Sequence, residues 1–216
     1  PLCALGLLLR PTDPLWGYYR DRALILMRGV PPREMRMQAV GAAADPNSGG
    51  RQMSEHFSDP RRAICPYLSP TGANVLPAAG LAEAVKMTRK LLGDGQFPPD
   101  SIVYTATGDG TTAEGEVYEG LRAAINFQSP LLFHLMDDGF GISVPVSEQV
   151  PGGDVGSLFK HWPGLLYIAN DGLDFRESYA NFKIAVDHCR SGRGPVMVHS
   201  KATSPALGRS RSCAGC

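Results

Sequence analysis

The sequence predicts an α/β fold of three layers around a mainly parallel sheet, and three observations lead to this prediction. Short apolar runs alternate with helical periodicity from about residue 70 to residue 200. Strands that helices of this length separate are joined by right-handed crossovers, which leave neighbouring strands parallel. The chain has 216 residues, of which 43% are hydrophobic, and this is enough to bury one sizeable core.

Four short apolar runs are the expected strands of the sheet. Each is bounded by residues that favour turns or by a helical pattern, as buried strands of parallel sheets are. They are residues 101–106 (SIVYTA), 130–136 (PLLFHLM), 165–169 (LLYIA) and 195–199 (PVMVH).

Helical periodicity separates these runs in the second half of the chain. Residues 114–127 and 175–189 each place their apolar side chains on one face at helical spacing. The glycines of residues 192–194 end the second helix. Both segments are therefore expected to be crossover helices that cover the sheet.

The first half of the chain is predicted to be more helical. Pro31 and Pro32 suit the start of a helix, and residues 45–51 (DPNSGGR) predict a turn-rich loop. Residues 71–92 predict a longer helix that is interrupted or kinked at Pro77.

Charge and cysteine content exclude several classes of protein. Lysine plus arginine and aspartate plus glutamate both number 21, so no basic excess indicates nucleic-acid binding. No apolar stretch reaches the ~18 residues of a membrane span. Five scattered cysteines form no disulfide framework and favour a reducing, cytoplasmic location.

The two ends of the chain differ in character. Residues 1–201 are expected to form one domain, and residues 202–216 (ATSPALGRSRSCAGC) an aperiodic tail that is disordered or foreign to the fold. Residues 2–9 are apolar but lack a preceding charged region and a small-residue cleavage site. We therefore expect a truncated amino terminus rather than a signal peptide.

The chemistry is expected in residues 108–115 (GDGTTAEG), which follow a predicted strand and open a predicted helix. Glycine lets backbone N–H groups approach a phosphate, and the amino end of a helix favours its negative charge. Gly108, Gly110 and Ala113 match the dinucleotide pattern G-x-G-x-x-A. A nicotinamide-dinucleotide-binding Rossmann domain is therefore one alternative.

Asp109 indicates a different kind of site. A carboxylate that faces phosphates is unfavourable unless a cation lies between them, and Mg²⁺ binds an octahedron of oxygens that protein and phosphate can share. Asp138, in the loop after the next predicted strand, can supply a second oxygen because adjacent parallel strands end side by side. Taken alone, Asp109 is equally well explained as a turn residue that caps the helix.

The order of these segments resembles a known family. Gly108-Asp109-Gly110, followed by a helix, a strand and a polar pair, resembles the thiamine-diphosphate motif G-D-G…N-N. The flanks resemble the α subunit of the first component of 2-oxoacid dehydrogenases, chiefly the branched-chain (2-oxoisovalerate) type and next the pyruvate type. These flanks are residues 17–22 (GYYRDR), 50–57 (GRQMSEHF), 69–72 (SPTG) and 141–146 (GISVPV).

The resemblance implies a role for each matched residue. The side chains of Asp109 and Asp138 and the backbone carbonyl of Phe140 would bind Mg²⁺, while Tyr19 and Arg20 would hold the diphosphate. The substrate would meet Met53, Tyr19 and Ser69, with His56 as the catalytic residue. The other cofactor-binding positions would be Ser69, Pro70, Thr71, Gly108, Gly110, Thr111, Thr112, Glu114, Gly141 and Ile142.

The implied activity is the oxidative decarboxylation of a small branched-chain 2-oxoacid, with acyl transfer to a lipoyl group. The implied cofactors are thiamine diphosphate and Mg²⁺, and the implied partners are a β subunit in an α₂β₂ assembly and a lipoyl-bearing acyltransferase. The β subunit of this family supplies the glutamate that activates the cofactor, so this chain alone is expected to be inactive. A catalytically inactive structural subunit is the second alternative.

Four departures from the family pattern are present, and two of them, Asp138 and a missing histidine, support that second alternative. Asp138 stands where asparagine is usual and adds a negative charge, and Met136 stands where some members carry an arginine. Gly141 replaces an alanine, a mild change. Residues 201–216 contain no histidine, whereas the family carries a catalytic histidine after the last strand, so a truncated or frame-shifted end is expected.

Overall fold

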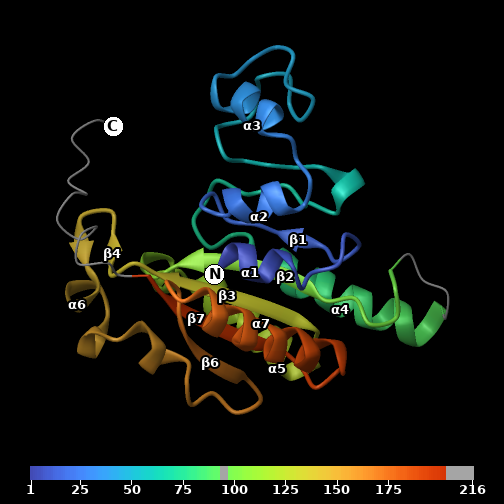
Figure 1. Ribbon diagram of the computed structural model, residues 1–216. Coiled ribbons are helices and arrows are strands. Elements are labelled where there is room, and N and C mark those ends of the chain that lie inside the picture. Colours follow the sequence, from blue (N-terminus) through green and yellow to red (C-terminus); the bar gives the residue numbers. More distant parts are fainter. Residues whose placement is uncertain (93–96, 203–216) are drawn as a thin grey trace.

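A computed structural model of the chain describes residues 1–92 and 97–202 (Figure 1). The predicted tail lies outside the described residues, apart from its first residue. Within the described part, five strands form one sheet in the order β1-β2-β3-β7-β6, and every neighbouring pair is parallel. The predicted α/β fold with a parallel sheet is therefore confirmed.

The four predicted strands all form, each displaced by one or two residues toward the carboxyl end. Ile102 precedes the sheet because its N–H donates to the Asp13 carboxylate, 3.2 Å away, and not to a neighbouring strand. A fifth strand, β1, was not predicted because two residues carry no periodicity. The strands of the sheet are β1 (Leu15–Trp16), β2 (Val103–Gly108), β3 (Leu131–Asp137), β6 (Leu166–Asp171) and β7 (Val196–Lys201).

The helices agree with the predicted crossovers. Asp174 begins the last helix by accepting hydrogen bonds from the N–H groups of Arg176 and Glu177. Gln128 ends α5 in the left-handed region, with φ 50°. The helices are α1 (Leu2–Gly6), α2 (Arg22–Met27), α3 (Pro32–Ala39), α4 (Val75–Leu92), α5 (Gly115–Phe127), α6 (Val146–Gln149) and α7 (Phe175–Arg190).

The prediction of a helix over residues 71–92 that breaks at Pro77 is wrong in its start and in its break. Helix α4 begins at Val75 and continues past the proline. Pro77 therefore lies in the first turn, where backbone N–H groups have no partner within the helix. Its missing N–H removes no helical hydrogen bond there, so the helix stays intact.

Helices cover both faces of the sheet, so the fold has three layers with the sheet in the middle (Figure 1). On one face, Tyr104, Leu132 and Val198 of the strands belong to the same buried cluster as Leu5 of α1 and Phe182 of α7. The other face packs against α4 and α5, whose alanines pack with Val103 and Leu131. Among the residues that the structure describes, no helix combines the length and apolarity that crossing a lipid bilayer requires.

Helices α4 and α5 approach each other closely at Gly120. A Cβ atom at this position would lie 2.8 Å from Val75 Cγ1 and 3.1 Å from the Val75 carbonyl group. We expect Gly120→Ala to lower the free energy of unfolding by about 1–3 kcal/mol, because the crowding outweighs the better helix propensity of alanine.

The matched control is Gly80, which lies in α4 with nothing within 4 Å of its Cβ position. Gly80→Ala is expected to raise the free energy of unfolding by up to about 1 kcal/mol. Urea denaturation of both variants tests the packing, and it would contradict the close approach if the two substitutions shifted stability in the same direction.

Candidate functional site

The carboxyl ends of β2 and β3 bring the two predicted metal-binding loops together. Gly108, the last residue of β2, is the register partner of Met136 in β3. The Asp109 N–H donates to the Met136 carbonyl oxygen across 3.1 Å. Asp109 therefore lies at the same edge of the sheet as the loop that carries Asp137 and Asp138.

Asp109 is 2% exposed, and its two carboxylate oxygens differ in their surroundings. Oδ1 accepts a hydrogen bond from the Gly110 N–H at 2.9 Å, so the capping interpretation accounts for this oxygen. Oδ2 is buried without a hydrogen-bond partner among the described residues. An oxygen of this kind is costly unless a proton or a cation meets it.

The charges around Asp109 also favour a proton or a cation at its carboxylate. The pKa of Asp109 is raised to about 6, chiefly by burial and also by the charges of Asp137 and Asp138, while the hydrogen bond from Gly110 and the charge of Arg20 act in the opposite direction. Three carboxylates and one guanidinium therefore act on one another here. A divalent cation would relieve this repulsion.

The loop after β3 is shaped by its own carboxylates. Asp137 Oδ1 accepts from the Gly139 N–H at 2.9 Å, and Asp138 Oδ1 accepts from the Phe140 N–H at 3.2 Å. Asp137 Oδ2 lies 2.9 Å from His199 Nε2, at the end of β7. Asp137 is thus engaged within the fold, and Asp138 follows it in the loop that leads to Phe140.

The Asp137–His199 pair was not predicted, although both residues lie near the ends of adjacent strands. Burial alone would raise the pKa of Asp137, but the hydrogen bond and charge of His199 hold it below its ordinary value. His199 Nδ1 in turn lies 2.6 Å from the Tyr167 hydroxyl. The pair therefore fixes the base of the loop that leads to Asp138 and Phe140.

Three predicted glycines lie close to the polar ends of other side chains. A Cβ on Gly108 would lie 2.9 Å from the Tyr18 hydroxyl, and a Cβ on Gly110 would lie 3.0 Å from Gln149 Oε1. On Gly141 it would lie 2.5 Å from the same Gln149 oxygen. Tyr18 and Gln149 are thus site residues that the sequence interpretation missed, although Tyr18 directly precedes the predicted Tyr19 and Arg20.

Arg20 lies beside this edge of the sheet. Its Nη1 donates to the Tyr18 hydroxyl at 3.2 Å, and its guanidinium lies 4.9 Å from the centre of the Tyr19 ring. Its charge lowers the pKa of Asp109, which places it within electrostatic range of the carboxylates. The structure thus places Arg20 next to Gly108, the residue that precedes Asp109.

Met53, His56 and Ser69 form a second group. The Ser69 hydroxyl lies 2.7 Å from His56 Nε2 and 3.7 Å from Met53 Sδ. His56 Nδ1 lies 2.9 Å from the Ser54 carbonyl oxygen, which can only accept. In neutral His56 the proton is therefore on Nδ1, and the Ser69 hydroxyl donates to Nε2.

The remaining predicted residues surround these two groups. The segment with Pro70 and Thr71 is exposed, and a Cβ on the following Gly72 would lie 3.3 Å from Thr111 Cγ2 and 3.2 Å from Glu114 Cβ. This contact connects the second group to the start of α5. Thr112 is buried and donates to the Asp109 carbonyl, whereas Glu114 and Ile142 are exposed.

The carboxylates of this site do not form a complete metal site by themselves. In the described part of the chain, no group of three or more His, Cys, Asp or Glu side chains could hold a metal ion. Two carboxylates would need backbone, water or phosphate oxygens to complete the octahedron of Mg²⁺.

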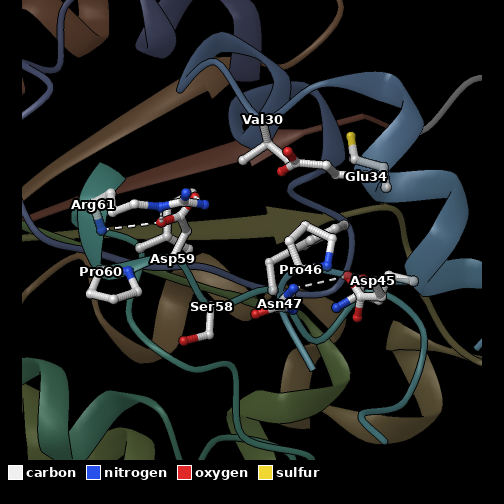
Figure 2. A pocket seen from close by; sticks show the side chains of 13 residues that line it. Val30, Glu34, Asp45, Pro46, Asn47, Ser58, Asp59, Pro60 and Arg61 are labelled. Carbon is white, nitrogen blue, oxygen red and sulfur yellow. Dashed lines mark hydrogen bonds and ion pairs between the residues drawn. The ribbon is translucent and has the colours of Figure 1, made fainter. Parts of the chain in front are cut away.

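A cavity of about 300 Å³ lies elsewhere, between α3 and residues 45–64, and contains none of the predicted site residues. Figure 2 shows two interactions among its polar residues, one between Arg61 and Asp59 and one between Asn47 and Asp45. Arg61 Nε lies 3.0 Å from Asp59 Oδ1, and the Asn47 N–H donates to Asp45 at 3.1 Å. With these groups satisfied, the cavity gives no sign of a ligand.

Comparison with known proteins identifies the family. Residues 4–202 match the dehydrogenase E1 component family. The chain belongs to this family. The predicted resemblance is thereby confirmed, and the match lends no support to the nicotinamide-binding alternative.

Relatives of this E1 component chain are α subunits. It is 31% identical over 193 residues to the 2-oxoisovalerate dehydrogenase subunit alpha of Bacillus subtilis, covering 88% of this chain and 55% of that protein. It is 29% identical over 212 residues to the 3-methyl-2-oxobutanoate dehydrogenase subunit alpha of Mycobacterium tuberculosis, covering 94% and 52%. The chain spans about half the length of these curated relatives.

Solved structures support the fold of the E1 component chain. A transketolase from Campylobacter jejuni superposes with a TM-score of 0.66 over 95% of this chain and 33% of the transketolase. The sequence identity is 19%, so the likeness concerns the fold alone.

Proposed function

We propose that this chain is the cofactor-binding part of the α subunit of a branched-chain 2-oxoacid dehydrogenase. In this proposal, the side chains of Asp109 and Asp138 and the backbone carbonyl of Phe140 would hold Mg²⁺, which thiamine diphosphate needs for its diphosphate. The observation that carries the proposal is the buried Asp109 Oδ2, which lacks a partner among the described residues and lies near further carboxylates. The similarity to 2-oxoisovalerate dehydrogenase α subunits supports the substrate class.

The residues at this edge of the sheet fit a metal-bridged diphosphate. Carboxylate and carbonyl oxygens are the ligands that Mg²⁺ prefers, and Asp109 has one buried oxygen to give. Arg20 supplies positive charge beside Gly108, and neither Gly108 nor Gly110 has a side chain of its own that would keep a phosphate from the backbone N–H groups. Thr111 and Thr112 follow in the turn that leads into α5.

Thiamine diphosphate, when bound, would supply the nucleophile and the electron sink that decarboxylation requires. The chain would supply position and charge. Asp109 and Asp138 would hold the cation, while Tyr19 and Arg20 would hold the phosphates. On the substrate side, His56 would present Nε2, which now lies 2.7 Å from the Ser69 hydroxyl, and Met53 and Ser69 would lie beside it.

Two partners belong to the proposal. The α-subunit names of the relatives support a β subunit as partner, and we propose an α₂β₂ assembly whose β subunit completes the active site. A lipoyl-bearing acyltransferase would accept the acyl group. We propose that the chain is inactive without these partners.

A structural subunit without catalytic activity is the second candidate. Asp138 favours it, because Asp109, Asp137 and Asp138 together place three negative charges at a site that would also receive a diphosphate. Weak or absent cofactor binding would follow if one cation and Arg20 failed to offset these charges.

Isothermal titration with thiamine diphosphate separates the candidates. It is performed with and without Mg²⁺, on the chain alone and on the chain coexpressed with a β subunit of the family. Metal-dependent binding is the expected result. Binding of NADH without metal would contradict the proposal in favour of a dinucleotide-binding domain, and no binding of either ligand in both preparations would establish the structural subunit.

A further inference from the structure

Tyr19 and Arg20 form the tip of a turn, and two hydrogen bonds between Tyr18 and Asp21 close this turn. The Asp21 N–H donates to the Tyr18 carbonyl oxygen at 2.8 Å. In the opposite direction, the Tyr18 N–H donates to Asp21 Oδ2 at 2.9 Å. The two residues between these hydrogen bonds are the two that the proposed function assigns to the diphosphate.

Asp21 itself is inaccessible to a ligand. It is 0% exposed, whereas Arg20 at the tip is exposed. Its second oxygen, Oδ1, lies 3.4 Å from the Tyr104 hydroxyl of β2, and that hydroxyl lies 3.1 Å from His134 Nδ1 of β3. The turn is thus fastened through Asp21 to the two strands whose ends carry Asp109 and Asp138.

We propose that Asp21 is a positioning residue that holds the Tyr19–Arg20 tip against the ends of β2 and β3. This inference rests on the proposed function, since it gives Asp21 a role only if the tip holds a diphosphate. Asp21 would not touch the ligand. It would act by fixing where the Arg20 guanidinium lies relative to Gly108, whose Cβ position is 3.6 Å from Arg20 Nη1.

The burial of this carboxyl group is costly, which indicates that its position matters to the fold. Burial raises the pKa of Asp21 to about 7, against the hydrogen bonds from Tyr18 and Tyr104. The polar groups that face Asp21 are Tyr18, Tyr67, Tyr104 and, through Tyr104, His134. A turn that needed only to be compact would form without a buried acid.

Two substitutions distinguish the hydrogen bonds of Asp21 from its negative charge. Asparagine at this position keeps an oxygen that accepts from the Tyr18 N–H, and its NH₂ group can donate to the Tyr104 hydroxyl. That hydroxyl can then donate to His134 Nδ1. Alanine removes the acceptor and leaves the Tyr18 N–H buried without a partner.

The test titrates Mg²⁺ with thiamine diphosphate into the wild-type chain coexpressed with a β subunit, and into variants. We expect Asp21→Ala to weaken binding about tenfold, the size of one lost hydrogen bond to a charged group, and Asp21→Asn to stay within about threefold of wild type. Thermal melting shows whether each variant is folded. A folded Asp21→Asn that loses binding about tenfold, or a folded Asp21→Ala that binds as wild type does, would overturn the inference.

A double-mutant cycle with Arg20→Ala distinguishes positioning from general loosening of the fold. If Asp21 acts through Arg20, the double variant should bind about as weakly as Arg20→Ala alone. Additive losses would contradict positioning. If Asp21→Ala does not fold, Asp21→Asn alone decides, and if wild type binds no thiamine diphosphate, the proposed function has failed first.

Discussion

Asp109→Asn is expected to abolish Mg²⁺-dependent binding of thiamine diphosphate and, at the same time, to stabilise the metal-free chain. Removal of a carboxylate ligand should weaken Mg²⁺-dependent binding by about 100-fold or more. The same charge is a burden without metal, because Oδ2 is buried and lacks a partner among the described residues. The free energy of unfolding should rise by roughly 1–2 kcal/mol above pH 6.

The pH dependence has a definite sign. The pKa of Asp109 is raised to about 6 in the folded chain, so folding is favoured at low pH, and this stability is lost as pH rises through 6. The gain from Asp109→Asn should therefore be largest above pH 6 and disappear near pH 4. In wild type, proton competition should weaken Mg²⁺ binding about tenfold for each pH unit below about 6.

Urea denaturation without metal at pH 5 and pH 8, with Mg²⁺ and cofactor titrations beside it, measures both effects. Asp171→Asn is the matched control, because Asp171 also ends a strand of the sheet but is exposed. The control should change neither quantity. A less stable Asp109→Asn variant at pH 8, or one that binds with wild-type affinity, would refute the proposed role of Asp109.

Asp13→Ala is expected to cause the largest loss of stability, about 3–5 kcal/mol. Asp13 is fully buried and accepts hydrogen bonds from Arg190 Nη1 at 3.1 Å and Nη2 at 2.6 Å. It also accepts from the N–H groups of Arg10 at 2.7 Å and Ile102 at 3.2 Å. Alanine would leave the mostly buried Arg190 charge and these N–H groups without their acceptor.

Asp187→Ala is the control for this prediction, because Asp187 pairs with Lys183 on the exposed side of α7. Its expected cost is below about 0.5 kcal/mol. In Asp13→Ala/Arg190→Met the unpaired charge is gone as well, so part of the stability should return. Urea denaturation measures these losses. If Asp13→Ala and Asp187→Ala lowered the free energy of unfolding equally, the Asp13–Arg190 pair would not be a major source of stability.

Apolar periodicity in the sequence predicts the crossover helices and the longer strands of the sheet. The apolar stripe of residues 175–189 became α7, and the run at residues 130–136 became β3. Gly108-Asp109-Gly110 could be assigned to the end of a strand because it follows an apolar run and precedes a helical pattern. The predicted break at Pro77 is wrong because a proline breaks a helix only beyond its first turn. The sequence pattern does not show that the helix begins at Val75.

Contacts between distant residues could not be predicted in this way. Strand β1 consists of Leu15 and Trp16 and exists because β2 offers it an edge. The Asp13–Arg190 and Asp137–His199 pairs join segments far apart in the sequence, and neither residue type reveals its partner. For the candidate site, the sequence named Asp109, Arg20 and Asp138, and it missed the Tyr18 hydroxyl and the Gln149 amide, which surround the glycines.

The two-residue strand β1 has a consequence for how the molecule opens. The Pro14 carbonyl oxygen accepts from the Tyr104 N–H at 3.0 Å, a contact that closes a longer loop of chain than any other strand pairing in the sheet. Partial unfolding should thus release the amino-terminal segment, with Tyr19 and Arg20, before the central strands separate. In native-state hydrogen exchange, the Tyr104 amide should lose protection before that of Phe133 in β3.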